Sequence, residues 1–181
     1  MRRTIFALIC GSLLLSFAAC SKSEQANKNA SSNASNSASP ATATKTPPAN
    51  IVIAGATPVQ ITPGGAAEAV VLVNISEGYH INANPASAKF LIATTLEVEK
   101  GEGIRPGEPQ YPPSVTKKFP FSPDPLAVYE GEATIKVQLK AATDTRKGEH
   151  TLRAKLRVQP CDDQTCYPPR DIETSIPVNV N

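Results

Sequence analysis

The sequence lacks an excess of charge of either sign, and it lacks the residue patterns of several common active sites. Its 181 residues include 18 Lys and Arg against 16 Asp and Glu, a net charge of +2. We therefore expect no basic surface for nucleic acid. The only histidines are His80 and His150, and neither has the spacing from the cysteines that a zinc site needs. A glycine-rich phosphate loop and a serine-hydrolase motif are also absent, so we expect no metal and no cofactor.

The sequence also lacks a hydrophobic run long enough to cross a bilayer. Residues 5–19 are almost wholly apolar and follow Arg2 and Arg3, but these roughly 15 residues fall short of the roughly 20 that a spanning helix needs. A short basic segment, an apolar segment and small residues at its end are the layout of a secretory signal. Removing residues 1–19 removes two of the 18 basic residues and no acid, which leaves 16 against 16.

Residues 15–20, Leu-Ser-Phe-Ala-Ala-Cys, resemble a bacterial lipobox. The resemblance implies that Cys20 is lipidated and that residues 1–19 are its signal peptide, with an ordinary signal cleaved nearby as the alternative. It also makes Ser21 compatible with sorting to the outer membrane. We therefore expect a protein of the bacterial periplasm, anchored to a membrane through lipid, because several acyl chains together hold firmly.

Residues 20–49 are expected to form a flexible tether after the lipid site. They are rich in Ser, Ala, Asn, Thr and Pro and have almost no large apolar side chains. Such a segment buries too little apolar surface to offset its ordering entropy. A coil of about 29 residues has a root-mean-square span of roughly 30 Å. The alternative is a simple spacer without a length requirement.

Residues 50–181 are expected to form one β domain. Apolar and polar residues alternate in four stretches, at residues 90–98, 135–139, 152–158 and 172–180. Period two in short runs between Gly and Pro clusters favours an antiparallel β-sandwich. The more continuous apolar run at residues 70–75 suits a central strand. The Pro-rich residues 101–125 are expected to be one long loop, which either has a function or merely crosses between the sheets.

Two of the four cysteines are expected to remain for chemistry in this domain. Cys10 lies in the predicted signal and Cys20 is the predicted lipid site, which leaves Cys161 and Cys166 around Asp-Asp-Gln-Thr. They directly follow a predicted strand. If the chain turns back there, the cysteines face each other at Cα distances of about 4.5–5.5 Å, which a disulfide accepts. We therefore expect a disulfide, which an exported protein can retain.

The size of this ring only mildly favours exchange over a structural role. A 15-residue loop gains about 3 kcal/mol from a disulfide, and this six-residue ring gains on the order of 2 kcal/mol. A domain of about 130 residues builds its own core without such help. We expect the polar loop to be exposed to a partner's thiol. Asp162 and Asp163 are expected either to disfavour a thiolate on the neighbouring cysteines or to be simply turn residues. Because the first effect would leave the pair without strong activation of its own, we expect a partner's thiolate to attack the oxidised disulfide.

Residues 158–169, Val-Gln-Pro-Cys-Asp-Asp-Gln-Thr-Cys-Tyr-Pro-Pro, resemble the active-site segment of the N-terminal periplasmic domain of the thiol:disulfide interchange protein DsbD. The likeness covers about residues 55–180 and includes residues 77–82, 111–113, 119–121 and 129–131. It implies an immunoglobulin-like sandwich. It also implies that Cys161 and Cys166 accept electrons from a thioredoxin-like domain and pass them to periplasmic reductases. The loop between the cysteines is one residue shorter here than in that family.

The resemblance also implies roles for residues around the pair. Phe121, or after it Phe119, matches an aromatic residue of a cap loop that covers the disulfide, and core packing of both rings is the alternative. His80 and Asn82 match positions that line the site and would share one face of a strand. A hydrogen-bonded structural histidine is the alternative for the first. Tyr167, directly after the pair, is placed to pack against a partner.

No membrane electron carrier and no thioredoxin-like domain follow in this sequence, so we expect separate partners. These are thioredoxin-like periplasmic proteins and a membrane thiol transporter, and the protein itself is expected to be a monomer. The favoured function is a dithiol/disulfide carrier, which we expect to act as a protein-disulfide reductase or another component of thiol:disulfide interchange. A binding or adaptor lipoprotein with a structural disulfide is the second hypothesis. A structural lipoprotein of the envelope is the third.

Overall fold

The structure is a computed structural model that describes residues 47–181, and all regular secondary structure in this range is β. The predicted signal peptide, the predicted lipid site at Cys20 and most of the predicted tether lie outside the described residues. Within the described range, no helix has the length and apolar character needed to span a bilayer.

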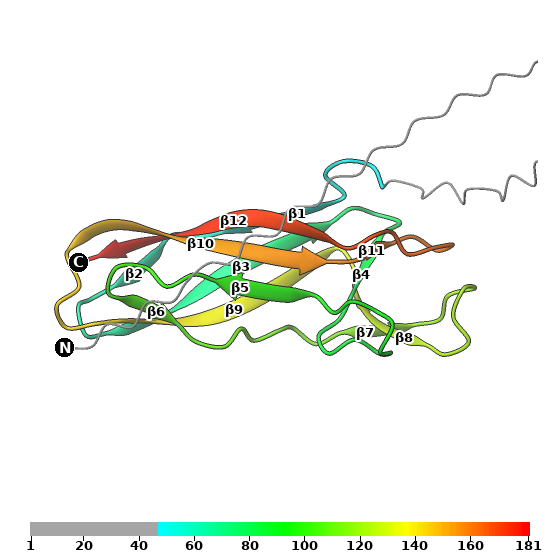
Figure 1. Ribbon diagram of the computed structural model, residues 1–181, viewed down its shortest axis with the longest axis horizontal. Coiled ribbons are helices and arrows are strands. Elements are labelled where there is room, and N and C mark those ends of the chain that lie inside the picture. Colours follow the sequence, from blue (N-terminus) through cyan, green and yellow to red (C-terminus); the bar gives the residue numbers. More distant parts are fainter. Residues whose placement is uncertain (1–46) are drawn as a thin grey trace, which may run out of the picture. The chain divides into compact units, whose positions relative to one another are not determined.

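Two four-stranded sheets form the body of the domain (Figure 1). The first has the order β1 (Val52–Ala56), β3 (Ala66–Ile75), β9 (Glu132–Ala141) and β6 (Ile104–Pro106). The second has the order β2 (Val59–Ile61), β12 (Arg170–Val180), β10 (Gly148–Val158) and β5 (Thr95–Val98). Neighbouring strands are antiparallel, apart from β2 and β12, which are parallel.

Alternating burial explains why the long strands pack as two layers. Every second residue of β9 is buried, from Ala133 to Ala141, and the same holds in β10 from Leu152 to Val158. Successive side chains of a strand point to opposite faces, so each sheet turns one apolar face inward. These faces share one core that includes the central strand β3. The predicted all-β, immunoglobulin-like sandwich is confirmed.

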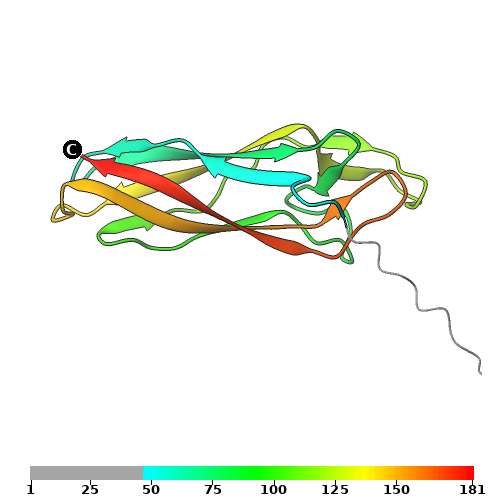
Figure 2. The same ribbon diagram turned by 90° about the horizontal axis from the view of Figure 1, so that it is seen from above.

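A third, smaller sheet carries the cysteine segment. Its order is β11 (Pro160–Cys161), β4 (His80–Asn82), β8 (Leu126–Tyr129) and β7 (Val115–Lys117). In Figures 1 and 2 these elements lie at the end of the domain opposite the C-terminus. A separate cluster of buried side chains, Leu91, Phe119, Leu126 and Val128, lies here. The cysteines therefore belong to an end sheet with its own small core.

Two local predictions were wrong. Residues 90–98 do not form one strand: only Thr95–Val98 does, and Phe90 is 76% exposed. The preceding loop is held by side-chain hydrogen bonds, such as Asn84 Nδ2 to the Thr94 carbonyl at 2.8 Å. Residues 101–125 are not one loop either, because they contain β6 and β7. Both are edge strands, where proline is tolerated because one side of the backbone needs no ladder partner.

Candidate functional site

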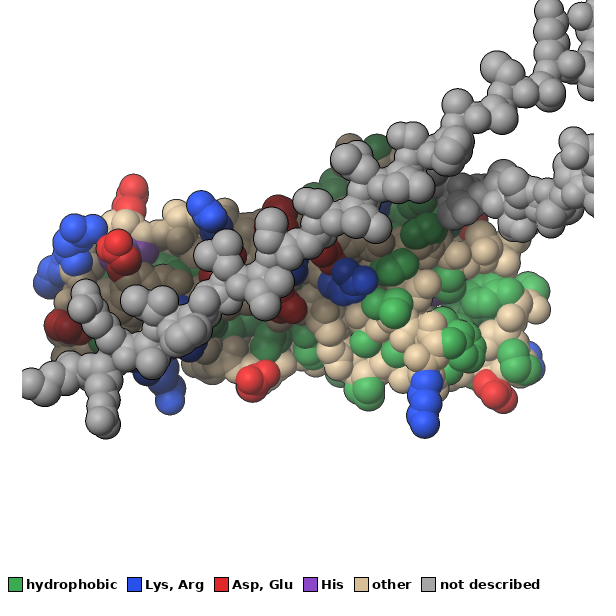
Figure 3. All heavy atoms as spheres, in the orientation of Figure 1, with side chains coloured by type: hydrophobic (Ala, Val, Ile, Leu, Met, Phe, Trp, Pro, Cys, Tyr) green, Lys and Arg blue, Asp and Glu red, His purple; other side chains and the backbone are tan. Residues whose placement is uncertain are grey.

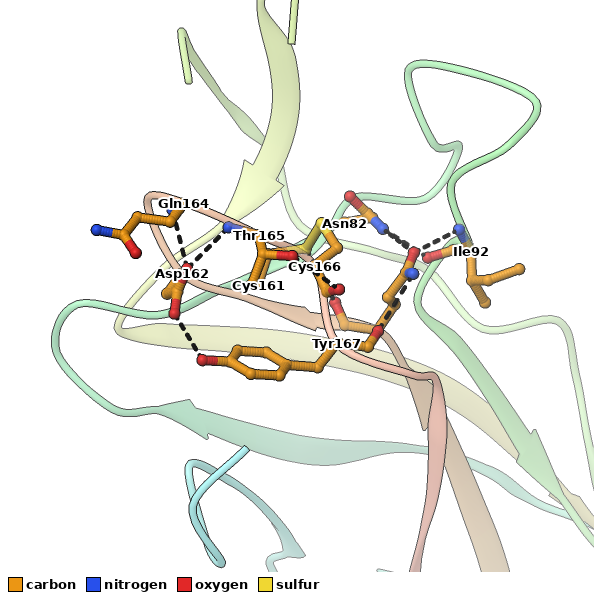
Figure 4. The surroundings of a disulfide bond; sticks show 9 residues. Asn82, Ile92, Cys161, Asp162, Gln164, Thr165, Cys166 and Tyr167 are labelled. Carbon is orange, nitrogen blue, oxygen red and sulfur yellow. Dashed lines mark hydrogen bonds between the residues drawn. A yellow bond between two sulfur atoms is a disulfide. The ribbon is translucent and has the colours of Figure 1, made fainter. Parts of the chain in front are cut away.

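A short hairpin at the end of β11 brings the two cysteines together. Cys161 and Cys166 face each other in an isolated antiparallel bridge, and their sulfurs form a disulfide with the Cα atoms 4.0 Å apart (Figure 4). Two backbone hydrogen bonds close the hairpin, from Asp162 N to the Thr165 carbonyl and from Tyr167 N to the Pro160 carbonyl. The disulfide that the spacing predicted is present.

The two cysteines differ in exposure. Cys161 is 0% exposed, whereas Cys166 is half-buried. The prediction of an exposed loop is therefore wrong for its first cysteine, because Cys161 lies in β11 and pairs with β4 inside the end sheet. Of the two cysteines, only Cys166 has surface exposed to another protein.

Asp162 shapes the loop between the cysteines. Its Oδ1 accepts hydrogen bonds from the backbone N–H groups of Gln164 and Thr165, at 2.8 and 2.9 Å (Figure 4). This arrangement is an Asx turn, in which the carboxylate replaces a backbone acceptor. The turn interpretation of this acid therefore has a direct structural basis. Asp163, the other acid, is exposed.

Tyr167 donates its hydroxyl to Asp162 Oδ2 at 2.5 Å (Figure 4). This hydrogen bond, reinforced by burial of the ring, raises the pKa of Tyr167 to about 12, so the phenol stays protonated at neutral pH. The side chain is buried and its ring lies 6.4 Å from that of Tyr79. Tyr167 therefore supports the loop from within the domain, and it offers almost no free surface to a partner.

Gln159 links three segments around the site, a role that its sequence position alone did not reveal. Its Oε1 accepts hydrogen bonds from Ile92 N and from Asn82 Nδ2, both at 3.0 Å. Its Nε2 donates to the Tyr167 carbonyl at 3.3 Å. The predicted site residue Asn82 is fully buried and also donates to the Ile92 carbonyl. The only sequence signal was a polar residue immediately before the Pro-Cys pair.

Replacing this link should loosen the site. Gln159→Leu leaves the Ile92 N–H and the Tyr167 carbonyl without this partner and removes one of two hydrogen bonds of the Asn82 amide, and each unpaired buried group costs about 1–3 kcal/mol. We expect the free energy of unfolding to fall by about 2–4 kcal/mol, measured by denaturant titration. Gln164→Leu is the matched control, since Gln164 is exposed in the adjacent loop. A loss as large in the control would refute this role of Gln159.

His80 lies beside Cys161 in the end sheet. The two residues are register partners in β4 and β11, and such partners point their side chains to the same face. His80 is 1% exposed, and its Nε2 is buried without a hydrogen-bond partner. Burial lowers the pKa of His80, and the nearby carboxylate of Glu130 partly opposes this effect. The predicted site residues His80 and Asn82 thus both flank the disulfide segment from β4.

The two candidate cap residues form one stack over His80. The Phe119 ring lies 4.0 Å from the His80 ring between centroids, and the Phe121 ring lies 5.3 Å from Phe119 and 6.5 Å from His80. Phe119 is 1% exposed and belongs to the small end core, whereas Phe121 is 36% exposed. The inner position is therefore occupied by Phe119, and the preference for Phe121 as the cap stays a prediction.

Exposed apolar side chains occur at the same end of the domain. Phe90 precedes β5, Val115 lies in β7, and Phe121 lies between β7 and β8. Figure 3 shows hydrophobic side chains gathered on the visible face at this end. Among residues 47–181, no group of three or more His, Cys, Asp or Glu side chains is placed to hold a metal ion.

Comparison with known proteins gives a family match and matches to solved structures, among them the following two. The DsbD N-terminal domain of Neisseria meningitidis, in its reduced form, is 21% identical with a TM-score of 0.43, over 61% of this chain and 77% of that one. The N-terminal periplasmic domain of ScsB from Proteus mirabilis is 13% identical with a TM-score of 0.44, over 69% of this chain. This chain spans only 44% of the ScsB structure. No curated protein matches.

The family match covers most of the chain. The model of the N-terminal region of the thiol:disulfide interchange protein DsbD matches residues 51–176, which include the end sheet and both cysteines of the disulfide. The chain therefore belongs to the family of DsbD N-terminal domains.

Proposed function

We propose that the Cys161–Cys166 pair is redox-active and that the protein exchanges disulfides with thioredoxin-like proteins in the bacterial periplasm. The observation that carries this proposal is the disulfide between two cysteines five residues apart, inside the region that matches a thiol:disulfide interchange family. A six-residue ring adds little stability to a domain with a complete core. Exchange chemistry gives the pair a function that stabilisation does not.

The difference in burial sets the order of events. A donor's thiolate attacks Sγ of Cys166, the half-buried cysteine, and Cys161 leaves as a thiolate that takes up a proton. The donor's second cysteine then attacks its own sulfur in the mixed disulfide and frees Cys166. The pair has gained two electrons and two protons. Delivery to an acceptor runs through the same steps in reverse.

The exposed apolar residues at this end supply a contact surface for such partners. Phe90, Val115 and Phe121 lie on the segments that surround the end sheet. Exposed apolar patches with a polar surround are typical of protein–protein contact sites. A partner whose reactive cysteine is surrounded by apolar surface would bury these side chains while its sulfur approaches Cys166.

The remaining sequence predictions complete the proposal. Residues 1–19 are the signal peptide, Cys20 carries the lipid, residues 20–49 are the tether, and residues 50–181 are the redox domain. The protein is a monomer anchored to a membrane, with the outer membrane favoured, and a separate membrane thiol transporter supplies its electrons. The tether lets the domain reach partners without leaving the membrane.

A second function, an adaptor domain with a purely structural disulfide, is favoured by one observation. Cys161 is fully buried and the neighbouring His80 lies under Phe119, as expected of a bond that never opens. The midpoint potential of the pair separates the two functions. Equilibration of the full chain in dithiol redox buffers should give about −120 to −270 mV, the range of exchange proteins, and a value below about −300 mV would support the adaptor.

A further inference from the structure

We propose that His80 accepts the proton of Cys161 when this buried cysteine resolves a mixed disulfide at Cys166. The inference rests on the proposed function and deepens it, because it names the group that activates the second step of the exchange. It concerns the pair's own proton transfer and does not depend on which protein is the partner.

The first argument is the register of the end sheet. Cys161 pairs with His80 of β4 on one side and with Cys166 on the other. Paired residues of neighbouring antiparallel strands share a face, with Cβ atoms about 4.5–5.5 Å apart. His80, Cys161 and Cys166 thus form one row across the sheet. The imidazole is the titratable side chain beside the sulfur that must become a nucleophile, and residues 161–166 contain no Lys, Arg or His of their own.

The second argument is the unpartnered nitrogen. His80 Nε2 is buried and has no hydrogen-bond partner in the described structure, which is unfavourable. Buried polar groups are nearly always paired, so a lone one points to a partner that comes and goes. The oxidised pair offers no thiol proton. Reduction creates an S–H donor at Cys161, next to the imidazole.

The third argument is the environment of the ring. Phe119 stacks on His80 and covers it, and burial lowers the pKa of the imidazole, with Lys117 of β7 acting in the same direction. Glu130 after β8, and Asp163 and Asp162 in the cysteine loop, raise this pKa. The net effect favours the neutral imidazole, which is the form that accepts a proton. The three carboxylates then favour the imidazolium once it has formed.

The chemical step balances without an additional reactant. In the mixed disulfide, the Cys161 thiol gives its proton to His80, and the resulting thiolate attacks Sγ of Cys166. The Cys161–Cys166 bond forms as the bond between Cys166 and the partner's sulfur breaks. The partner's sulfur leaves with the electron pair as a thiolate and receives the proton from the imidazolium. The pair is oxidised and the partner is reduced.

The test uses the reduced full chain and 5,5′-dithiobis(2-nitrobenzoate), which releases one coloured thiolate when Cys166 attacks and a second when Cys161 resolves. In His80→Phe, which keeps a ring against Phe119 but removes both nitrogens, we expect the second release at pH 7 to slow by about 100-fold. The first release should stay within about twofold, since a general base for Cys161 does not act on it. The second release should recover towards that of the original protein as the pH rises beyond about 8.5, because a thiol then ionises increasingly without a base.

Two further variants make the result decisive. His80→Gln keeps a polar side chain that does not titrate, and it should slow the second release as much as His80→Phe does. If His80→Phe folds poorly, His80→Gln provides the test. His150→Gln removes the other histidine, near the start of β10, and should change neither release. The proton-transfer role would be overturned if the rate of the second release kept its original pH profile in both His80 variants, or if His80→Gln kept the full rate of this release. Failure of Cys166 to form any mixed disulfide would instead count against the proposed function.

Discussion

Cys161→Ala is expected to accumulate a mixed disulfide with a thioredoxin-like reductase, whereas Cys166→Ala should accumulate less than about a tenth as much, because exchange requires access to the attacking sulfur. The reason is burial: Cys161 is 0% exposed and Cys166 is half-buried. A thiolate left at position 166 reaches a partner's sulfur at the surface, whereas one left at position 161 lies inside the end sheet.

The experiment requires a partner that cannot resolve the product. A thioredoxin-like reductase with its second cysteine replaced, and its first activated as a nitrothiobenzoate disulfide, is mixed with each variant. Non-reducing electrophoresis and intact mass spectrometry then measure the captured fraction. The two variants are matched, since each loses the same six-residue ring and the stabilisation of about 2 kcal/mol that it provides.

Each outcome has a distinct meaning. Capture through Cys166 alone supports both the exchange function and the order of attack. Equal capture by the two variants contradicts the order, because burial of Cys161 would then not limit access. Capture by neither variant contradicts exchange, and it favours the adaptor with a structural disulfide. A variant lacking both cysteines provides the background.

The strands that the sequence pattern predicted are those that depend on residues close together in the sequence. Strands β9, β10 and β12 follow from period-two alternation, because each long strand has one face on the core. The loop before β5 has equally apolar residues, but its path is set by contacts distant in sequence. The Ile92 N–H bonds to Gln159, 67 residues later, and alternation contains no information about such a partner.

The candidate site likewise combines features that neighbouring residues predict with features that depend on residues far away in the sequence. The pairing of Cys161 with Cys166 was predictable, since it depends on six consecutive residues and a turn. The burial of Cys161 was not, because it results from the pairing of β11 with β4, about 80 residues earlier. The direction of Tyr167 was also not predictable. An aromatic residue after a cysteine fits either a partner surface or the interior, and the hydrogen bond to Asp162 decides for the interior.

Phe119→Ala is expected to destabilise the protein by about 3–5 kcal/mol, the usual cost of removing a buried phenylalanine ring, and to speed reduction of the disulfide by dithiothreitol about tenfold through greater access. Phe119 fills the small end core and lies directly on His80, which neighbours Cys161. Its loss opens a path to the buried sulfur. Urea titration measures the first effect and trapping of free thiols over time measures the second.

Phe121→Ala is the matched variant, since it removes the same side chain from the outer position of the stack. We expect a stability change below about 1 kcal/mol, since Phe121 is 36% exposed and substitutions of exposed residues cost little. Its reduction rate should stay within about twofold of the original protein, because access to the sulfurs is unchanged. Faster reduction in Phe121→Ala without loss of stability would reverse this assignment. The outer ring would then be the cap that the family resemblance predicted, and Phe119 would serve the small core alone.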